Sequence, residues 1–165
     1  MELGLRVAAR FDSELVFSSG AYAAVVEIDP ATGELTVERV AAVDDAGTII
    51  NPLLAHGQIV GGAVQGLGEC VIEEAVYDEE GQLRTATFMD YGLLTAADVP
   101  EIVTGEVVSP SPRNPLGAKG VGEGGTIGTL PAVANAVADA LEGRRLDPPY
   151  QPEKLWRALS DTRPT

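Results

Sequence analysis

A glycine-rich loop with one carboxylate at its centre constrains this chain more than any other feature. Residues 117–125 read GAKGVGEGG, with Glu123 among five glycines, and an alanine-rich segment follows. Glycine lets a backbone adopt positive φ and pass close to a ligand, at an entropic cost. A helix that begins just downstream adds free N–H groups and the positive end of a dipole, which suit an anion. Glu123 is therefore a helix cap, an ion-pair partner of Lys119, or a catalytic group.

The N-terminal part of the chain predicts a β-hairpin. Residues 22–29 and 35–43 are rich in residues that favour strands, and the link 30–34 contains proline and glycine. Residues 1–18 have no strong hydrophobic period, so we expect an irregular segment there. We expect one domain over residues 19–165.

A long helix with many glycines is expected over about residues 54–76, where apolar residues recur every three or four positions. Each glycine destabilises a helix by up to about 1 kcal/mol relative to alanine. The glycines therefore indicate that another backbone or a ligand approaches closely. Gln58 and Gln65 return to nearly the same face of this helix, where their amides can bind a polar cofactor. On the residues alone, a glycine contact between two backbone segments is the favoured explanation.

Shorter elements complete the expected fold. The pattern predicts strands at 82–88 and 102–108, a helix at 130–141, and a terminal helix at 153–159 that Trp156 anchors. Cys70 falls in the apolar part of the long helix and is expected to be a buried, unreactive thiol. The expected class is α+β, with a mixed sheet, a hairpin and two main helices.

Composition excludes several function classes. The formal net charge is −14, which argues against nucleic acid or anionic lipid as a partner. No apolar run is long enough to cross a bilayer and no signal-peptide pattern is present, so a cytoplasmic protein is expected. The lone cysteine excludes a protein-held iron–sulfur cluster, a disulfide framework and a thiolate zinc site within this chain. The lone histidine, His56, argues against a histidine-rich metal site and a Ser-His-Asp triad. Asp44, Asp45 and Asp90 are expected in strand-end turns and caps rather than as metal ligands.

Several segments in one order resemble the C-terminal part of the large, molybdopterin-binding subunit of the xanthine dehydrogenase family. That family includes aldehyde oxidases and aerobic carbon monoxide dehydrogenase. The matching segments are 25–34, 43–52, 57–68, Asp90-Tyr91, 117–123 and 152–156. The resemblance runs from about Ser19 to the end of the chain and implies a partial molybdenum-cofactor-binding domain.

Carried over position by position, the resemblance implies a site. Glu123 matches the catalytic glutamate of the family. The implied cofactor-binding residues are Gly57, Gln58, Gly61, Gly62, Gln65, Gly120 and Gly122. No protein ligand to the metal is implied, because the pterin of molybdenum–molybdopterin, including its cytosine dinucleotide form, holds the molybdenum. The cofactor carries the chemistry, and the protein orients it and supplies a base.

The resemblance also implies an activity and partners. It implies an oxidoreductase that hydroxylates a small carbonyl, heterocyclic or carbon monoxide-type substrate, with water as the oxygen source. Family large subunits are several times longer, so we expect no activity without the missing upstream half. Iron–sulfur and flavin (FAD) subunits are the expected electron-accepting partners. Two alternatives are a non-catalytic or degenerate fragment that serves only as an interaction or assembly domain, and a phosphate-binding module built on the glycine loop.

Overall fold

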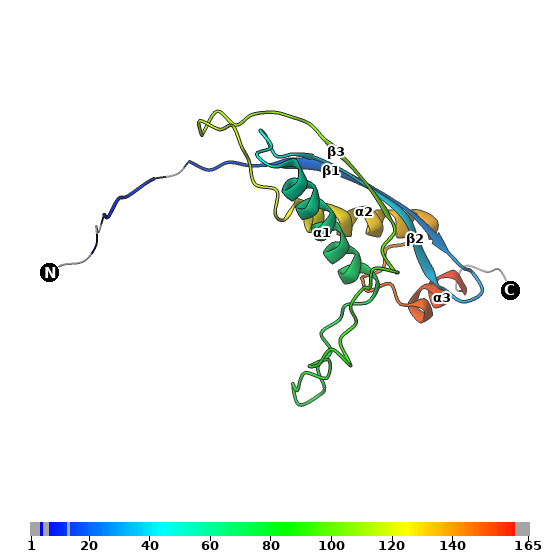
Figure 1. The fold of residues 1–165 in the computed structure, drawn as a ribbon. Coiled ribbons are helices and arrows are strands. Elements are labelled where there is room, and N and C mark those ends of the chain that lie inside the picture. Colours follow the sequence, from blue (N-terminus) through cyan, green and yellow to red (C-terminus); the bar gives the residue numbers. More distant parts are fainter. Residues whose placement is uncertain (1–3, 5–6, 13, 161–165) are drawn as a thin grey trace.

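A three-stranded mixed sheet forms one layer of the fold, and two long helices cover one of its faces (Figure 1). The structure, a computed structural model, describes residues 4, 7–12 and 14–160. The elements in chain order are β1 (Ser19–Ile28), β2 (Leu35–Asp45), α1 (Pro52–Val71), β3 (Glu101–Glu106), α2 (Gly124–Ala140) and α3 (Pro152–Ser160). This arrangement confirms the predicted α+β class with a mixed sheet and a hairpin.

The predicted hairpin is formed by β1 and β2, which pair antiparallel from Ser19↔Asp45 to Ile28↔Leu35 with one irregularity at Val25/Val26. The turn between the strands is stabilised by the carboxylate of Asp29, which accepts hydrogen bonds from Ala31 N at 2.8 Å and Thr32 Oγ1 at 3.0 Å. The strand β3 then pairs parallel with β2.

The core lies between the sheet and the helices. Side chains along β1 alternate between exposed and partly buried, as expected of a sheet with one covered face. Asn51 caps α1, because its side chain accepts a hydrogen bond from Leu54 N at 3.2 Å. The buried cluster consists of Val40, Leu67, Cys70, Val133, Val137, Leu141, Tyr150, Leu155 and Ala158.

Glycines bring α1 and α2 into direct backbone contact. A Cβ atom at Gly125 would lie 2.5 Å from Ile59 O, and one at Gly66 would lie 2.9 Å from Thr126 O. At these positions glycine permits the crossing, because any side chain would collide with the neighbouring helix. The close approach that the glycines predicted is therefore present at this part of α1.

The long helix is shorter than predicted and ends at Val71 instead of residue 76. The amides of Ile72 and Glu73 both donate to Gly68 O, at 3.0 and 2.8 Å, which turns the chain out of the helix. The chain then runs through an irregular excursion before β3, part of which projects from the body (Figure 1).

The strand predicted at 82–88 does not form in this excursion. The only strand-like pairing that the structure describes in the segment is one isolated bridge between Tyr77 and Leu83. Local side chains take the place of a ladder here. Thr85 Oγ1 accepts a hydrogen bond from Val76 N at 3.1 Å and donates one to Glu74 O at 3.0 Å. Such bonds offer the backbone an alternative to sheet pairing.

Two further predictions were wrong in detail. The second main helix begins at Gly124 rather than at residue 130, because packing against α1 overrides the low helix propensity of its glycines. In α3 the fully buried residue is Leu155, whereas Trp156 is half exposed. Leu155 is therefore the anchor of the terminal helix.

Cys70 is buried in the core, as predicted, and its Sγ lies 3.7 Å from Leu130 O. Burial, with a smaller contribution from the charge of Glu69, raises the pKa of this thiol from 9.0 to about 12. A rise of this size lowers the thiolate fraction roughly 1000-fold at neutral pH. We expect Cys70 to react with a water-soluble disulfide reagent at least about 100-fold more slowly in the folded chain than in denaturant. Equal rates in both states would contradict this account of the core.

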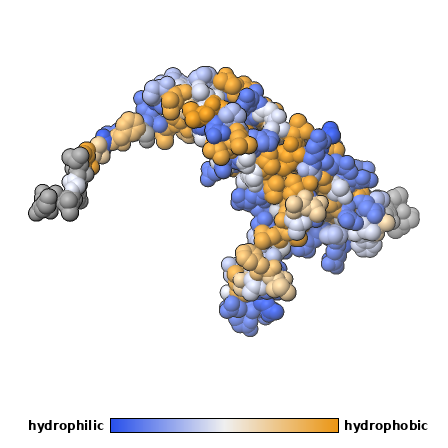
Figure 2. All heavy atoms as spheres, viewed as in Figure 1, coloured by the Kyte–Doolittle hydropathy of each residue, from blue (hydrophilic) through white to orange (hydrophobic). Residues whose placement is uncertain are grey.

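The surface carries many apolar side chains. Figure 2 shows them gathered over the middle of the body on the face viewed. Large exposed apolar residues near the start of α1 are Ile50, Leu53 and Leu54, and Ile127 is exposed on the first turn of α2. Within the described residues, no helix combines the length and apolarity needed to cross a membrane.

Candidate functional site

Glu123 occupies the N-cap position of α2, but its side chain makes no capping hydrogen bond. The side chain is exposed. The ammonium of Lys119 pairs instead with Asp45, with 2.7 Å between Nζ and Oδ2. Among the described residues, the Glu123 carboxylate therefore has neither of the two structural roles that the sequence left open.

Main-chain contacts fix the loop that carries Glu123. Thr48 N donates to Gly117 O at 3.0 Å, and Lys119 N donates to Ala46 O at 2.8 Å. Gly47 and Gly117 both have positive φ, +63° and +69°, and a Cβ atom at Gly47 would lie 2.2 Å from Gly117 O. Glycine is required where the two segments meet. The end of β2 and the glycine loop therefore form one connected unit.

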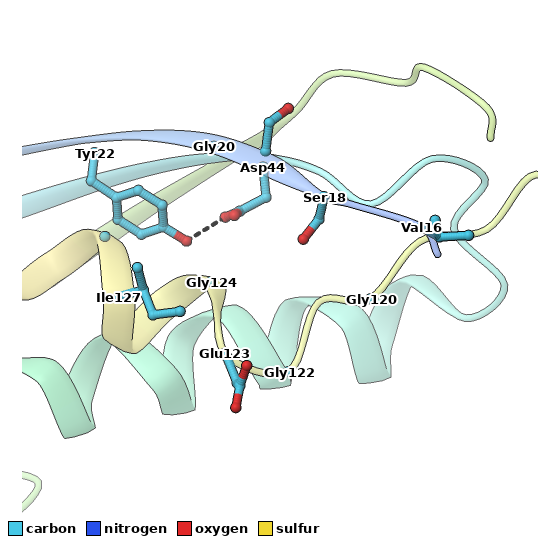
Figure 3. Close-up of a pocket in the computed structure, with 12 residues that line it drawn as sticks. Val16, Ser18, Gly20, Tyr22, Asp44, Gly120, Gly122, Glu123, Gly124 and Ile127 are labelled. Atoms are coloured by element: carbon cyan, nitrogen blue, oxygen red, sulfur yellow. Dashed lines mark hydrogen bonds between the residues drawn. The ribbon is translucent and has the colours of Figure 1, made fainter. Parts of the chain in front are cut away.

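A cavity of about 410 Å³ lies between this loop and the start of β1. Its walls include Ser18, Tyr22 and Asp44 on one side and Gly122 and Glu123 on the other (Figure 3). The Tyr22 hydroxyl donates to Asp44 Oδ2 at 2.6 Å. The Glu123 carboxylate points away from this pair (Figure 3). The pair therefore supports the loop from the side opposite to that carboxylate.

Gln58 lies on α1 beside the same loop. It lines a separate cavity of about 270 Å³ that Lys119 and Val121 also line. A Cβ atom at Gly122 would lie 3.8 Å from Gln58 Oε1. The structure thus brings the exposed Gln58 side chain next to the residue that precedes Glu123, although 65 positions separate Gln58 and Glu123 in the chain.

Four of the five predicted glycines fall into two groups, and the fifth, Gly122, lies beside Gln58. Gly57, Gly61 and Gly120 face open space, because a Cβ atom at each would meet no atom within 4 Å. Gly62 instead faces α2, where its Cβ atom would lie 3.1 Å from Gly125 Cα. The first group leaves backbone accessible to another molecule, and Gly62 serves the helix crossing.

Gln65 is tied to its neighbours within the chain. Its Oε1 accepts a hydrogen bond from Thr126 Oγ1 at 3.4 Å, and its Nε2 donates to Glu69 Oε1 at 3.5 Å. The single hydroxyl proton of Thr126 is shared with Gly62 O, which lies 3.1 Å from Oγ1. Gln65 therefore contacts the first turn of α2, three residues after Glu123.

Two titratable groups beside the loop, Asp45 and Tyr22, have perturbed pKa values. The hydrogen bond from Lys119, followed by that from Gly47 N, lowers the pKa of Asp45 below its ordinary value. Burial, and then the hydrogen bond to Asp44, raises the pKa of Tyr22. Asp45 is therefore held as an anion and Tyr22 as a neutral phenol at physiological pH.

Protein ligands suited to a metal ion do not gather at this site. No group of three or more His, Cys, Asp or Glu side chains with metal-binding geometry occurs among the residues the structure describes. Asp45, which the sequence assigned to a turn, accepts a hydrogen bond from Gly47 N at 2.9 Å, as expected of a turn residue. It also accepts one from Lys119 Nζ.

Sequence reasoning missed the contribution of Tyr22 and Asp44. The alternation of β1 places Tyr22 on the covered face, so the sequence pattern could have predicted that its side chain points inward. Its contact with Asp44 and with the first turn of α2 depends on strand register and on the helix crossing. No local pattern encodes either of these.

Comparison with known protein families gives one match over most of the chain. A profile of the molybdopterin cofactor-binding domain matches residues 5–100. The match begins within the segment that the sequence pattern set apart as residues 1–18. It ends before the glycine loop.

Comparison with individual proteins extends the similarity beyond residue 100. The carbon monoxide dehydrogenase large chain of Hydrogenophaga pseudoflava is 39% identical over 165 residues, covering 98% of this chain and 20% of that protein. The nicotine 6-hydroxylase large subunit of Paenarthrobacter nicotinovorans is 44% identical over 161 residues, covering 95% of this chain and 20% of its own length. This chain thus spans about one fifth of the length of these curated relatives.

The fold is also similar to solved structures. A crystal structure of the Cu,Mo-CO dehydrogenase superposes with a TM-score of 0.83 and 39% sequence identity. The superposition covers 87% of this chain and 18% of that one. The arrangement of β1, β2, α1 and α2 is therefore found within a much larger polypeptide.

Proposed function

Because the chain belongs to the molybdopterin cofactor-binding domain family, we propose that it forms one wall of the cofactor site in a molybdenum hydroxylase. The proposed enzyme is an oxidoreductase that hydroxylates a small carbonyl, heterocyclic or carbon monoxide-type substrate, with water as the oxygen source. The observation that carries the proposal is the free carboxylate of Glu123 on a glycine loop beside the Gln58 side chain.

The residues present are suited to molybdenum–molybdopterin. A pterin needs hydrogen-bond donors and acceptors, which the exposed Gln58 amide supplies in one side chain. Close approach of a large planar group needs backbone without side chains, which Gly57, Gly61 and Gly120 provide. The cofactor carries its own molybdenum ligands, which is compatible with a chain that has one buried cysteine.

We assign the residues as follows. Gln58 would hydrogen-bond the cofactor, while Gly57, Gly61, Gly120 and Gly122 would let the backbone approach it. Gly62 and Gln65 contact α2, and they would hold α1 and α2 together on the side of the site away from the cofactor. The same assignment extends to the cytosine dinucleotide form of the cofactor.

Glu123 is proposed as the general base. When bound, the cofactor supplies the redox chemistry that hydroxylates the substrate carbon. Glu123 would accept a proton at its carboxylate, which is free to do so because no described residue hydrogen-bonds it. The main-chain bonds of Lys119 and Gly117 would hold this carboxylate in place relative to the cofactor.

We further propose that other polypeptides complete the site. The partners would be the upstream half of a large subunit, an iron–sulfur subunit and a flavin subunit with FAD, in the cytoplasm. Exposed apolar side chains support a covering partner: Ile50 and Leu54 line the cavity beside Gln58, and Ile127 lines the cavity beside Glu123. Without that partner one side of the cofactor would face solvent.

Co-expression tests the proposal. The chain purified alone and loaded with cofactor should reduce no dye when substrate is added. The chain purified with its upstream half and its iron–sulfur and flavin partners should contain molybdenum and reduce dye with substrate. Dye reduction by the isolated chain would contradict the need for partners. A stable complex without molybdenum would favour an assembly role instead.

A further inference from the structure

The strand β2 ends in two consecutive buried carboxylates, Asp44 and Asp45, which are 6% and 9% exposed. Neighbouring residues in a strand point to opposite faces of the sheet. Asp44 and Asp45 consequently have different partners, although both lie beside the loop that carries Glu123. Two adjacent buried charges require compensation, and the partners show how each is compensated.

Asp45 fixes the first half of the loop. Its Oδ2 accepts from Lys119 Nζ at 2.7 Å, and its Oδ1 accepts from Gly47 N at 2.9 Å and Ser109 N at 3.2 Å. Lys119 is four residues before Glu123, and its own amide is bonded to Ala46 O. The end of β2, Ser109 and the glycine loop thus meet at one carboxylate.

Asp44 fixes the second half of the loop from the opposite side. Its Oδ2 accepts from the Tyr22 hydroxyl at 2.6 Å, and its Oδ1 would lie 2.8 Å from a Cβ atom at Gly124. The Tyr22 ring lies directly against Gly128, where a Cβ atom would be 2.2 Å from Cδ2. Tyr22 and Asp44 are therefore packed on the first turn of α2, directly after Glu123.

We propose that Asp44, Asp45, Tyr22 and Lys119 form a loop clamp that positions Glu123. Asp45 and Lys119 fix the residues before Glu123, and Asp44 and Tyr22 fix the residues after it. They act through Glu123, whose carboxylate points away from Tyr22 and Asp44 (Figure 3). This role rests on the proposed function of Glu123, but the fixing of the loop can be measured without any cofactor.

Hydrogen exchange on the full chain provides the first measurement. The reporters are the amides of Thr48 and Lys119, which bond across the loop contact. We expect Asp45→Asn and Lys119→Met each to speed exchange at these amides at least about tenfold, with α1 amides unchanged. Tyr22→Phe removes one hydroxyl and should speed exchange only after Glu123, at the amide of Ile127.

The control variants Arg39→Met and Glu101→Gln each remove an exposed salt bridge. They should leave exchange at the amides of Thr48, Lys119 and Ile127 unchanged.

Turnover in the assembled enzyme provides the second measurement. We expect Lys119→Met and Asp45→Asn to lower kcat about tenfold or more with unchanged KM and molybdenum content, and Lys119→Arg to restore most of kcat. If these residues only stabilised the fold, the variants would lose stability or molybdenum content instead of losing kcat at unchanged KM. If loop exchange is unchanged in every clamp variant while Glu123→Gln abolishes turnover, the clamp is wrong and the proposed function stands. If loop exchange rises while Glu123→Gln leaves turnover intact, the clamp still fixes the loop and the role of Glu123 fails.

Discussion

Glu123→Gln is expected to lower kcat of the assembled hydroxylase by about 10³-fold, within the range that a positioned general base contributes. Glutamine has the same shape but cannot accept the proton. The free energy of unfolding should change by no more than about 1 kcal/mol, because the side chain is exposed and makes no capping bond. Steady-state kinetics and chemical denaturation of the same preparation measure the two quantities.

Glu38→Gln, on the exposed side of β2, is the matched control for the loss of one negative charge. It should leave both kcat and stability unchanged. Full activity in Glu123→Gln would remove the catalytic role. A large loss of stability at unchanged kcat would instead return Glu123 to the role of a helix cap.

Gly125→Ala is expected to lower the free energy of unfolding by about 3 kcal/mol. The added Cβ atom would lie 2.5 Å from Ile59 O and 2.6 Å from Ala63 N. Both contacts are with backbone of α1, so no side chain can rotate away to make room. The two helices must separate, and the buried residues between them lose contact. Denaturation followed by circular dichroism measures the change.

Gly61→Ala provides the matched control, since it makes the same substitution in the helix that crosses α2. Its Cβ atom would meet open space, so alanine should raise the free energy of unfolding by up to about 1 kcal/mol through helix propensity. Opposite signs for the two variants are therefore expected. Equal effects would mean that the glycines of this crossing are not sites of close contact.

The hairpin was predictable from sequence because its signals are local. Strand-forming residues flank a turn whose side chains, such as Asp29, bond within five residues. The start of α2 was not predictable in the same way. Glycine propensity argues against helix at Gly124 and Gly125, and only contact with α1 overrides it. The strand expected at 82–88 does not form because, in the part of the chain that the structure describes, no neighbouring strand pairs with it beyond one isolated bridge. Sequence alone does not reveal the missing partner.

The candidate site shows the same division. The loop and its carboxylate were visible as glycines around Glu123, and the amide of Gln58 was visible on a helix face. The spacing of these residues did not predict that they belong to one site. The resemblance to a family predicted it, and the structure places Gln58 beside Gly122. Tyr22 and Asp44 were missed because their contact depends on the register of β1 against β2. Lys119 was assigned as a possible partner of Glu123, whereas it pairs with Asp45 across 74 residues.

The parallel pairing of β3 with β2 also has a consequence for the order in which the chain folds. Arg39 pairs with Glu101, 62 residues away, whereas Ile28 and Leu35 meet across a short turn. Loop closure over the longer span costs about 2 kcal/mol more entropy than closure of the hairpin. We expect the hairpin to form early and β3 to join late, as non-local pairings slow folding. The carboxylate proposed for the chemistry lies beyond β3 in the chain and should be among the last groups to reach its native place.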